Sequence, residues 1–218
     1  WMGWVKKHYC YRFWNPSDPT KPEKIKITGM PAKKRENTPW TRRVLMVVTK
    51  LLLNDQWSEI EPYIIKEIES LADGRVPLDD LCISRSYKGV DAYKHLRQPH
   101  LQVVQKMEQR HRYRVPVNSR VFFMVVRGND KMYLRTETPD YVREHNIPLD
   151  YEYYMRNQLY KPLQKLLTYH PEIIHYELLF TTYMRRLQNK IHNAVDLVSS
   201  QKKRKMSLAD FVQQRRRV

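Results

Sequence analysis

The residues best suited to chemistry near the start of the chain are two lysines and a tyrosine in the run KKHY. Lys6 and Lys7 are adjacent, and adjacent side chains on a strand point to opposite faces. One ammonium group can then meet a phosphate while the other braces the site. Tyr9 falls on the same face as Lys7, where its ring and hydroxyl can pack against a sugar–phosphate backbone. The run predicts a phosphate contact, and the alternative interpretation is an edge strand with solvated lysines.

Two further groups of cations suit the same chemistry. Lys34 and Arg35 stand just before an expected helix start, where free backbone N–H groups also attract phosphate. Lysines and arginines then recur densely from residue 85 to residue 120, a pattern suited to wrapping the backbone of a duplex. In this second group the candidates for phosphate contacts are Lys88, Arg110 and Arg120. For each candidate, a plain solvated charge is the alternative.

The charge of the whole chain favours the same kind of partner. Its 218 residues include 40 Lys+Arg against 23 Asp+Glu, so the formal net charge is +17. The excess is spread along the chain rather than gathered on one amphipathic helix, which favours nucleic acid over a membrane surface. No apolar run approaches the roughly 18 residues of a membrane span, and no signal peptide is visible. The chain begins at Trp1 without an initiator Met, so we expect a piece of a longer protein.

Other chemistries find few residues to carry them. Cys10 and Cys82 are the two cysteines, which excludes a disulfide framework, and no Cys/His cluster has zinc spacing. This cysteine usage predicts a reducing compartment. His100 follows a proline at an expected helix start, but no nucleophile or carboxylate is placed to partner it. We therefore predict that His100 is a structural histidine.

Helices are expected to form most of the fold. Thr38 should cap a helix with Pro39 in its first turn, and Asp55 or Ser58 should cap the next helix, which Gly74 ends. Their core-facing positions are Val44, Leu45, Val48, Leu51 and Leu52, then Ile60, Ile64, Ile68 and Leu71. Further helices are predicted over 99–110, from Thr138 to about 144, from an Asp150 cap to 167 with either a kink or two helices meeting at Pro162, and over 173–198. One strand or a pair of strands is predicted over 1–13 with a turn at Gly3, and further strands are predicted over 25–27 ending at Gly29 and over 120–127.

Four segments along the chain carry a family resemblance, and the first two are short motifs. The run at 6–9 is similar to a Lys-Lys-x-Tyr motif. Thr28-Gly29, followed by KRENTP at 34–39, is similar to a series of Lys-Gly, Arg-Arg-Asp and Cys-Pro. The departures from that series are Thr28 for Lys, Lys34 for Arg, Glu36 for Asp and Thr38 for Cys.

The other two segments are longer. The stretch 81–121 contains Pro-His-x-x-Val at 99–103 and Asn-Ser-Arg-Val at 118–121, where the family has Gly-Asp-Arg-Val. Residues 148–167, PLDYEYYMRNQLYKPLQKLL, contain an Asp-x-x-Tyr-Tyr helix followed by Asn-Gln-Leu and Pro-Leu. Together, over about residues 3–168, the four segments resemble the C-terminal third of family B DNA polymerases.

The resemblance implies an α+β fold, mainly helical, made of the end of a palm domain and a thumb domain. We expect residues 1–76 to be the palm part, 77–198 the thumb, and 199–218 a basic, flexible tail. A boundary at 76–80 also follows from the prolines and turn residues there.

The implied function is to grip primer–template duplex for template-dependent DNA synthesis in replication. In this role Lys6, Lys7 and Tyr9 hold the primer terminus in line with the active site. Lys88 and Arg120 stand at turn positions where the family pattern recurs, so they are the preferred duplex contacts of the thumb.

The catalytic strings of the family do not occur in this sequence. Phosphoryl transfer uses two Mg²⁺ ions held by close carboxylates, which the family supplies from Asp-Thr-Asp and Ser-Leu-Tyr-Pro segments. Asp79-Asp80 lacks the flanking pattern. We therefore expect no cofactor in this chain and no activity from it alone, with Mg²⁺ bound in the missing catalytic part of the parent polymerase. The expected partners are primer–template DNA and the remainder of the polymerase, which comprises the catalytic palm, fingers and exonuclease.

Two overlapping signals lie in the tail. A run that resembles a nuclear import signal consists of Lys202, Lys203, Arg204 and Lys205. Leu208, Phe211 and Val212 have the spacing of a peptide that binds a sliding clamp or another processivity factor, without its Gln and second aromatic residue. A basic solvated tail that adds nonspecific DNA affinity is the alternative.

The sequence also bears on the source of the longer polymerase, and it leaves one alternative function open. It lacks the C-terminal Cys-rich metal module of some eukaryotic members, which favours a viral or archaeal-like parent, and the basic tail favours a large DNA virus. The expected location is the nucleus, of the host if the parent is viral, with a cytoplasmic replication site as the alternative. The rival function is that of a stand-alone, non-catalytic basic nucleic-acid-binding protein. The reading frame upstream of Trp1 discriminates between them, because catalytic strings there favour the polymerase.

Overall fold

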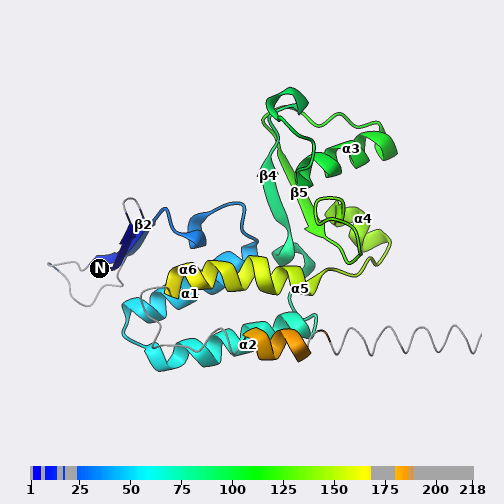
Figure 1. Cartoon of the computed structure of the whole chain (residues 1–218). Coiled ribbons are helices and arrows are strands. Elements are labelled where there is room, and N and C mark those ends of the chain that lie inside the picture. Colours follow the sequence, from blue (N-terminus) through cyan, green and yellow to red (C-terminus); the bar gives the residue numbers. More distant parts are fainter. Residues whose placement is uncertain are drawn as a thin grey trace, which may run out of the picture. The chain divides into compact units, whose positions relative to one another are not determined.

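The computed structural model describes residues 2–5, 8–13, 17, 24–167, 180–186 and 188. The chain forms two compact units, Trp1–Tyr176 and Glu177–Val218. In the second unit the described residues 180–186 are helical, and the Arg186 guanidinium lies 5.2 Å from the ring centre of Tyr183. The rest of the helix predicted over 173–198 lies almost entirely outside the described residues. The first unit mixes helices and strands, as predicted, and holds every element described below (Figure 1).

The first sheet is antiparallel, with strand order β1-β2-β3. Its strands are Met2–Val5, His8–Phe13 and Lys24–Thr28. The paired strands predicted at the start of the chain are confirmed, but the turn predicted at Gly3 is wrong, because Gly3 lies inside β1 opposite Tyr9. Tyr9 pairs on its other side with Thr28, so β2 is the central strand. Gly29 follows β3 with a φ of 66°, a conformation that glycine adopts without strain.

Helix α1 spans Pro39–Leu53 and begins as predicted. The Thr38 hydroxyl accepts a hydrogen bond from the N–H of Thr41 at 3.1 Å, and Pro39 occupies the first turn, where its missing N–H costs nothing. Trp40 is fully buried beside this start, a core position that periodicity does not reveal. The predicted stripe is buried except for Leu51, which is half-buried.

Helix α2 spans Ile60–Ala72 and buries the whole stripe predicted for it. Its predicted cap is wrong. A 3-10 turn, η2 (Trp57–Glu59), leads directly into the helix, and the N–H of Ile60 bonds to the carbonyl of Trp57. Asp55 instead takes a φ of 57° and accepts from the indole of Trp57. The turn satisfies the first backbone groups without a side-chain cap, and Gly74, at a φ of 69°, ends the helix region as predicted.

The second sheet is also antiparallel, with strand order β4-β5-β6. Its strands are Ile83–Ser86, Arg120–Val125 and Thr136–Glu137. The predicted strand at 120–127 is therefore confirmed, whereas β6 was not anticipated. Helix α3 (Pro99–His111) packs against β5 and β6. Helix α4 (Pro139–Glu144) starts where predicted, and the Thr138 side chain caps it by accepting from the N–H of Tyr141.

The last helical stretch of this unit changes its geometry twice. It runs through α5 (Tyr151–Tyr153), a π-helical segment η5 (Tyr154–Tyr160) and α6 (Lys161–Leu167). Asp150 caps its start as predicted, accepting from the N–H of Tyr153. The predicted discontinuity corresponds to the π segment, which ends just before Lys161 and Pro162. The N–H of Lys161 donates to the carbonyl of Arg156, five residues earlier. The nitrogen of Pro162 carries no hydrogen and cannot donate. The Gln158 side chain accepts from the N–H of Thr38 at 3.1 Å, which ties this helix to the start of α1 (Figure 1).

The segment around the predicted boundary is short and well connected. Three further 3-10 turns complete the fold, at Pro31–Lys33, Leu78–Leu81 and Val90–Ala92. Arg43 of α1 pairs with Asp80 at 2.6 Å, so an ion pair crosses the predicted boundary within one compact unit. Within the described ranges no helix is long and apolar enough to cross a membrane.

Candidate nucleic-acid interface

A groove of about 450 Å³ brings together cations that are far apart in sequence. We call it the basic groove and define it by Lys34, Arg35, Arg85, Tyr93, His100 and Arg120. The first two residues come from the segment before α1, Arg85 from β4, Arg120 from the start of β5, and His100 from the first turn of α3. Three of the residues predicted to contact phosphate therefore line one site.

Hydrogen bonds from Arg120 and Ser84 fix the position of the segment before α1. The Arg120 guanidinium donates to the Ser84 hydroxyl at 2.7 Å and to the Ser84 carbonyl at 3.1 Å. The Ser84 hydroxyl donates in turn to the carbonyl of Arg35 at 3.2 Å, and Arg120 also reaches that carbonyl at 3.5 Å. Residues 35, 84 and 120 thus form one small network that joins two strands to the segment.

The groove carries more positive than negative charge. Lys34 and Arg35 are exposed, and neither forms an ion pair with any residue that the structure describes. Arg120 bonds to carbonyl and hydroxyl oxygens, which do not neutralise its charge. Arg85 lies 3.4 Å from Glu36, and both side chains are 48% exposed, so this pair is weak. A site with this balance suits an anion with several oxygens, such as a phosphodiester.

The wall formed by Tyr93 and His100 is held by hydrogen bonds. The Tyr93 hydroxyl donates to the carbonyl of Ser86 and accepts from the N–H of Lys88, each at 3.2 Å. His100 Nε2 lies 3.1 Å from the same hydroxyl, and because the tyrosine proton is already used, Nε2 is the donor. Burial, followed by the charge of Arg85, lowers the pKa of His100, whose side chain is a neutral part of the wall rather than a catalytic base.

The start of α1 does not add N–H groups to the groove, contrary to our expectation for Lys34 and Arg35. The N–H of Thr41 is taken by the Thr38 hydroxyl, and the N–H of Thr38 is taken by Gln158. Thr38 and Thr41 are fully buried. The groove therefore offers side-chain cations and not a free helix terminus.

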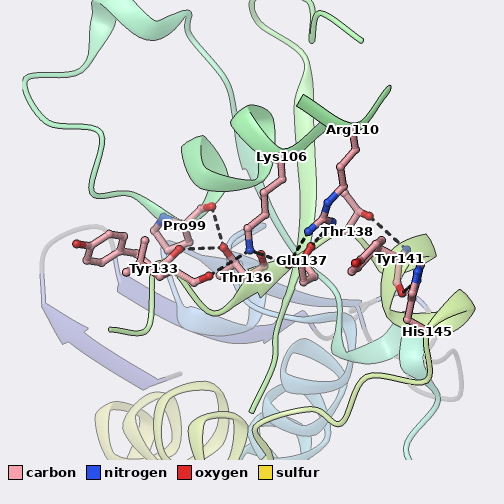
Figure 2. Close-up of polar contacts among 10 residues, drawn as sticks. Pro99, Lys106, Arg110, Tyr133, Thr136, Glu137, Thr138, Tyr141 and His145 are labelled. Atoms are coloured by element: carbon pink, nitrogen blue, oxygen red, sulfur yellow. Dashed lines mark hydrogen bonds and ion pairs between the residues drawn. The ribbon is translucent and has the colours of Figure 1, made fainter. Parts of the chain in front are cut away.

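Arg110, another predicted phosphate contact, lies in a different site. It donates to both oxygens of Glu137, at 2.7 and 3.2 Å, and its guanidinium lies 3.7 Å from the ring centre of Tyr141. Lys106 donates to Glu137 at 2.7 Å and to the carbonyl of Thr136 at 2.7 Å. Figure 2 shows Lys106 and Arg110 reaching from α3 toward Glu137, with Tyr141 beside them. We call Lys106, Arg110, Glu137 and Tyr141 the Glu137 cluster.

Both cations of the Glu137 cluster are engaged by one buried carboxylate. Glu137 is 7% exposed. Burial alone would raise its pKa, but hydrogen bonds from Arg110 and Lys106 outweigh burial and hold the pKa below its ordinary value. The same contact raises the pKa of Arg110. The cluster attaches α3 to β6 through the ion pairs of its two partly buried cations.

The remaining predicted site residues lie elsewhere. Tyr9 is half-buried on β2, and its ring stacks on that of Tyr11 at 5.9 Å, which in turn meets Phe13 at 4.7 Å. Lys88 is exposed after β4 and touches the groove wall through its backbone N–H. The predicted residues that lie outside the described part of the chain are Lys6, Lys7, Lys202, Lys203, Arg204, Lys205, Leu208, Phe211 and Val212.

Sequence reasoning missed the parts of the site that depend on distant contacts. Ser84 carries no motif of its own, and its bond to residue 35 appears only when β4 and β5 pair. The aromatic row on β2 had a signal, because Tyr9, Tyr11 and Phe13 alternate along one strand face. Arg85 was one of several similar cations without a distinguishing feature.

The acids and cysteines of the described residues form no metal site. No group of three or more His, Cys, Asp or Glu side chains there is placed to hold a metal ion. Asp79 pairs with Arg143 and Asp80 pairs with Arg43. Burial raises the pKa of both free cysteines, Cys10 and Cys82, to about 11, so both are neutral thiols at pH 7.

Comparisons with known proteins agree on one family. The sequence matches the description "DNA polymerase family B" over residues 4–170. The DNA polymerase delta catalytic subunit of Schizosaccharomyces pombe is 30% identical over 165 residues, which are 74% of this chain and 15% of that protein. The DNA polymerase of Paramecium bursaria Chlorella virus NY2A is 27% identical over 169 residues, 74% of this chain and 18% of that protein.

A solved structure supports the fold. The family B DNA polymerase from the archaeon Pyrobaculum calidifontis superposes with a TM-score of 0.56 at 23% identity, covering 65% of this chain and 18% of that one. The chain spans about 15% of the length of its delta relatives. Because the family match covers most of the sequence, this chain belongs to DNA polymerase family B.

Proposed function

We propose that this chain is the end of the palm and the thumb of a DNA-directed DNA polymerase, and that it grips primer–template duplex during replication. In this assignment residues 1–76 belong to the palm, 77–198 form the thumb, and 199–218 are a basic tail. Its relatives are DNA polymerases, of which this chain corresponds to a small part.

The observation that carries the proposal is the basic groove. Lys34, Arg35 and Arg120 converge there without a carboxylate partner in the described residues, although Asp and Glu are frequent in the chain. A polymerase must hold duplex of any sequence, which requires contacts to phosphates rather than to base edges. A groove of unneutralised cations has this property.

The individual residues then divide into contacts and supports. Lys34 and Arg35 are exposed and meet the phosphate directly. Arg120 contributes charge but acts mainly through Ser84, because its hydrogen bonds hold the backbone of residue 35. Arg110 is reassigned to support, since Glu137 already engages its guanidinium.

Other assignments extend the proposal beyond the groove. Lys88 contacts the duplex backbone next to the groove, and Lys6, Lys7 and Tyr9 hold the primer terminus. The chemical step belongs to the remainder of the polymerase, which supplies the carboxylates and binds Mg²⁺, so this chain alone is inactive. The parent is a viral polymerase working in the host nucleus. The tail carries an import signal at 202–205 and a peptide for a processivity factor at Leu208, Phe211 and Val212.

Binding experiments on the 218-residue chain test the proposal. Recessed primer–template, blunt DNA duplex, single-stranded DNA and duplex RNA are titrated across a salt series. Duplex gripping predicts the tightest binding to recessed primer–template and a log–log salt slope of several units, because each phosphate contact releases counterions. Equal affinity for all four nucleic acids would contradict the proposal.

A further inference from the structure

A second cavity, of about 660 Å³, adjoins the basic groove and shares Arg35, Ser84 and Arg120 with it. We call it the aromatic cavity, after Tyr113 and Phe122 in its lining. Met107 and Pro116 add further apolar surface. Its size is in the range of small-molecule sites, about 300–1,000 Å³. The cavity is large enough to admit a nucleotide.

The two aromatic rings remain open to solvent. Tyr113, in the connection between α3 and β5, is 51% exposed, and Phe122 of β5 is 52% exposed. Phe122 lies opposite Ser84 in the strand ladder, which places it next to the network that holds the basic groove. Half-exposed rings beside cations are the arrangement that binds unpaired bases, because every base has a π face that stacks on an aromatic side chain.

The charges around the cavity favour a ligand that brings its own phosphate. The acids in the lining, Asp79 and Asp140, both pair with Arg143. Arg35, Arg42 and Arg120 also line it and pair with no carboxylate in the parts of the chain that the structure describes. The Nε of Arg42 is buried and has no hydrogen-bond partner among those residues. An apolar protein segment would bury these charges unpaired, whereas a nucleotide neutralises them.

We propose that the aromatic cavity holds one unpaired base of a DNA strand whose neighbouring phosphate lies in the basic groove. The inference rests on the proposed function, because the groove must first hold the duplex. Stacking on Tyr113 and Phe122 binds the base without regard to its identity. Arg35 and Arg120, which line both sites, bridge base and backbone.

The probe is a DNA duplex with a short single-stranded tail that carries 2-aminopurine next to the paired region, prepared with 3′ and 5′ tails. Stacking quenches the fluorescence of this base. Saturating the probe with the 218-residue chain should lower its emission with at least one tail polarity. Tyr113→Leu and Phe122→Leu should each restore the emission and weaken tailed duplex about tenfold, while leaving affinity for blunt duplex unchanged. Leu134→Ala, at an exposed apolar position outside the cavity, is the matched control and should have no effect.

The outcomes separate the two proposals. If the wild-type chain binds duplex with a steep salt dependence but never quenches 2-aminopurine, the cavity holds no base and this inference is wrong while the proposed function stands. If both aromatic variants weaken blunt and tailed duplex equally, the cavity is an ordinary part of the duplex surface, and the inference again fails. If the chain shows no preference for DNA duplex at all, the proposed function itself fails. A thermal unfolding midpoint equal to that of the wild type shows that a variant has kept the fold.

Discussion

In the Glu137 cluster, Lys106 and Arg110 direct their charge at one buried carboxylate, whereas in the basic groove Lys34, Arg35 and Arg120 form no ion pair within the described residues, and the Glu36 carboxylate there pairs with Arg85. The two sites use the same side-chain types and lie in the same compact unit. In sequence they look alike, since both belong to dense runs of cations. The difference shows that the partner of a cation, and not its place in a basic run, decides whether it is available to DNA.

Removing the central carboxylate should give the largest effect. Glu137→Gln leaves Lys106 and Arg110 partly buried without a counter-charge, which should lower the free energy of unfolding by about 3 kcal/mol. Urea denaturation measures this loss. Glu108→Gln is the control, because Glu108 and Arg114 form a long, exposed pair whose removal should cost less than about 1 kcal/mol. Equal losses from both changes would show that the cluster is not a structural anchor.

Removing charge from the basic groove should weaken DNA binding without changing the stability of the fold. Lys34→Ala combined with Arg35→Ala should lower the log–log salt slope of duplex binding by about 2, and leave the unfolding midpoint unchanged. The reason is that both side chains are exposed and make no ion pair in the described structure. Lys50→Ala with Lys66→Ala removes the same charge from two exposed positions outside the groove that form no ion pair within the described residues, and it should change the slope little. An equal fall of the salt slope in both double variants would show that the groove contributes only through the overall charge of the chain.

Local sequence signals account for the elements that surround both sites. Thr38 and Asp150 were predicted as caps and Thr138 as the start of a helix, and all three side chains accept a bond from an N–H of the first turn. The cap predicted for α2 failed because a 3-10 turn competes with a side-chain cap, and such turns leave little trace in residue types.

Local signals did not predict which cations belong to the basic groove and which belong to the Glu137 cluster. Glu137 meets Lys106 and Arg110 only after β6 forms against α3, across sequence separations of 31 and 27 residues. The Ser84–Arg120–Arg35 network likewise spans 85 residues at its longest contact. The density of cations along the chain predicted Lys34, Arg35 and Arg120 as phosphate contacts, but it predicted Arg110 as well, which Glu137 engages elsewhere.

A smaller effect is expected from the network that positions the groove. Ser84→Ala removes the hydroxyl that links Arg120 to the carbonyl of residue 35, so duplex affinity should fall about fivefold, equivalent to about 1 kcal/mol. The charge is unchanged, so the salt slope should stay the same, which separates positioning from direct contact. Ser84→Thr keeps a hydroxyl and should restore most of the affinity. A changed slope in Ser84→Ala would instead make this residue part of the phosphate contact.

The smallest effect concerns acid sensitivity. The pKa of Glu137 in the folded chain lies below its ordinary value of 4.5, so its ion pairs stabilise the fold above that pH. This contribution is lost as the pH falls from 4.5 through the lower folded pKa. Unfolding measured from pH 7 downward should therefore show a shallower acid loss in Glu137→Gln than in the wild type. Parallel curves would mean that Glu137 does not titrate differently on folding.

The most direct test of the contrast between the two sites compares Arg35→Ala with Arg110→Ala. Each change removes one positive charge, and the salt dependence of primer–template binding is measured for both at a temperature where both remain folded. If the basic groove grips the duplex, the slope should fall by about 1 for Arg35→Ala and stay at the wild-type value for Arg110→Ala. Equal falls, or a fall for Arg110→Ala alone, would contradict the account.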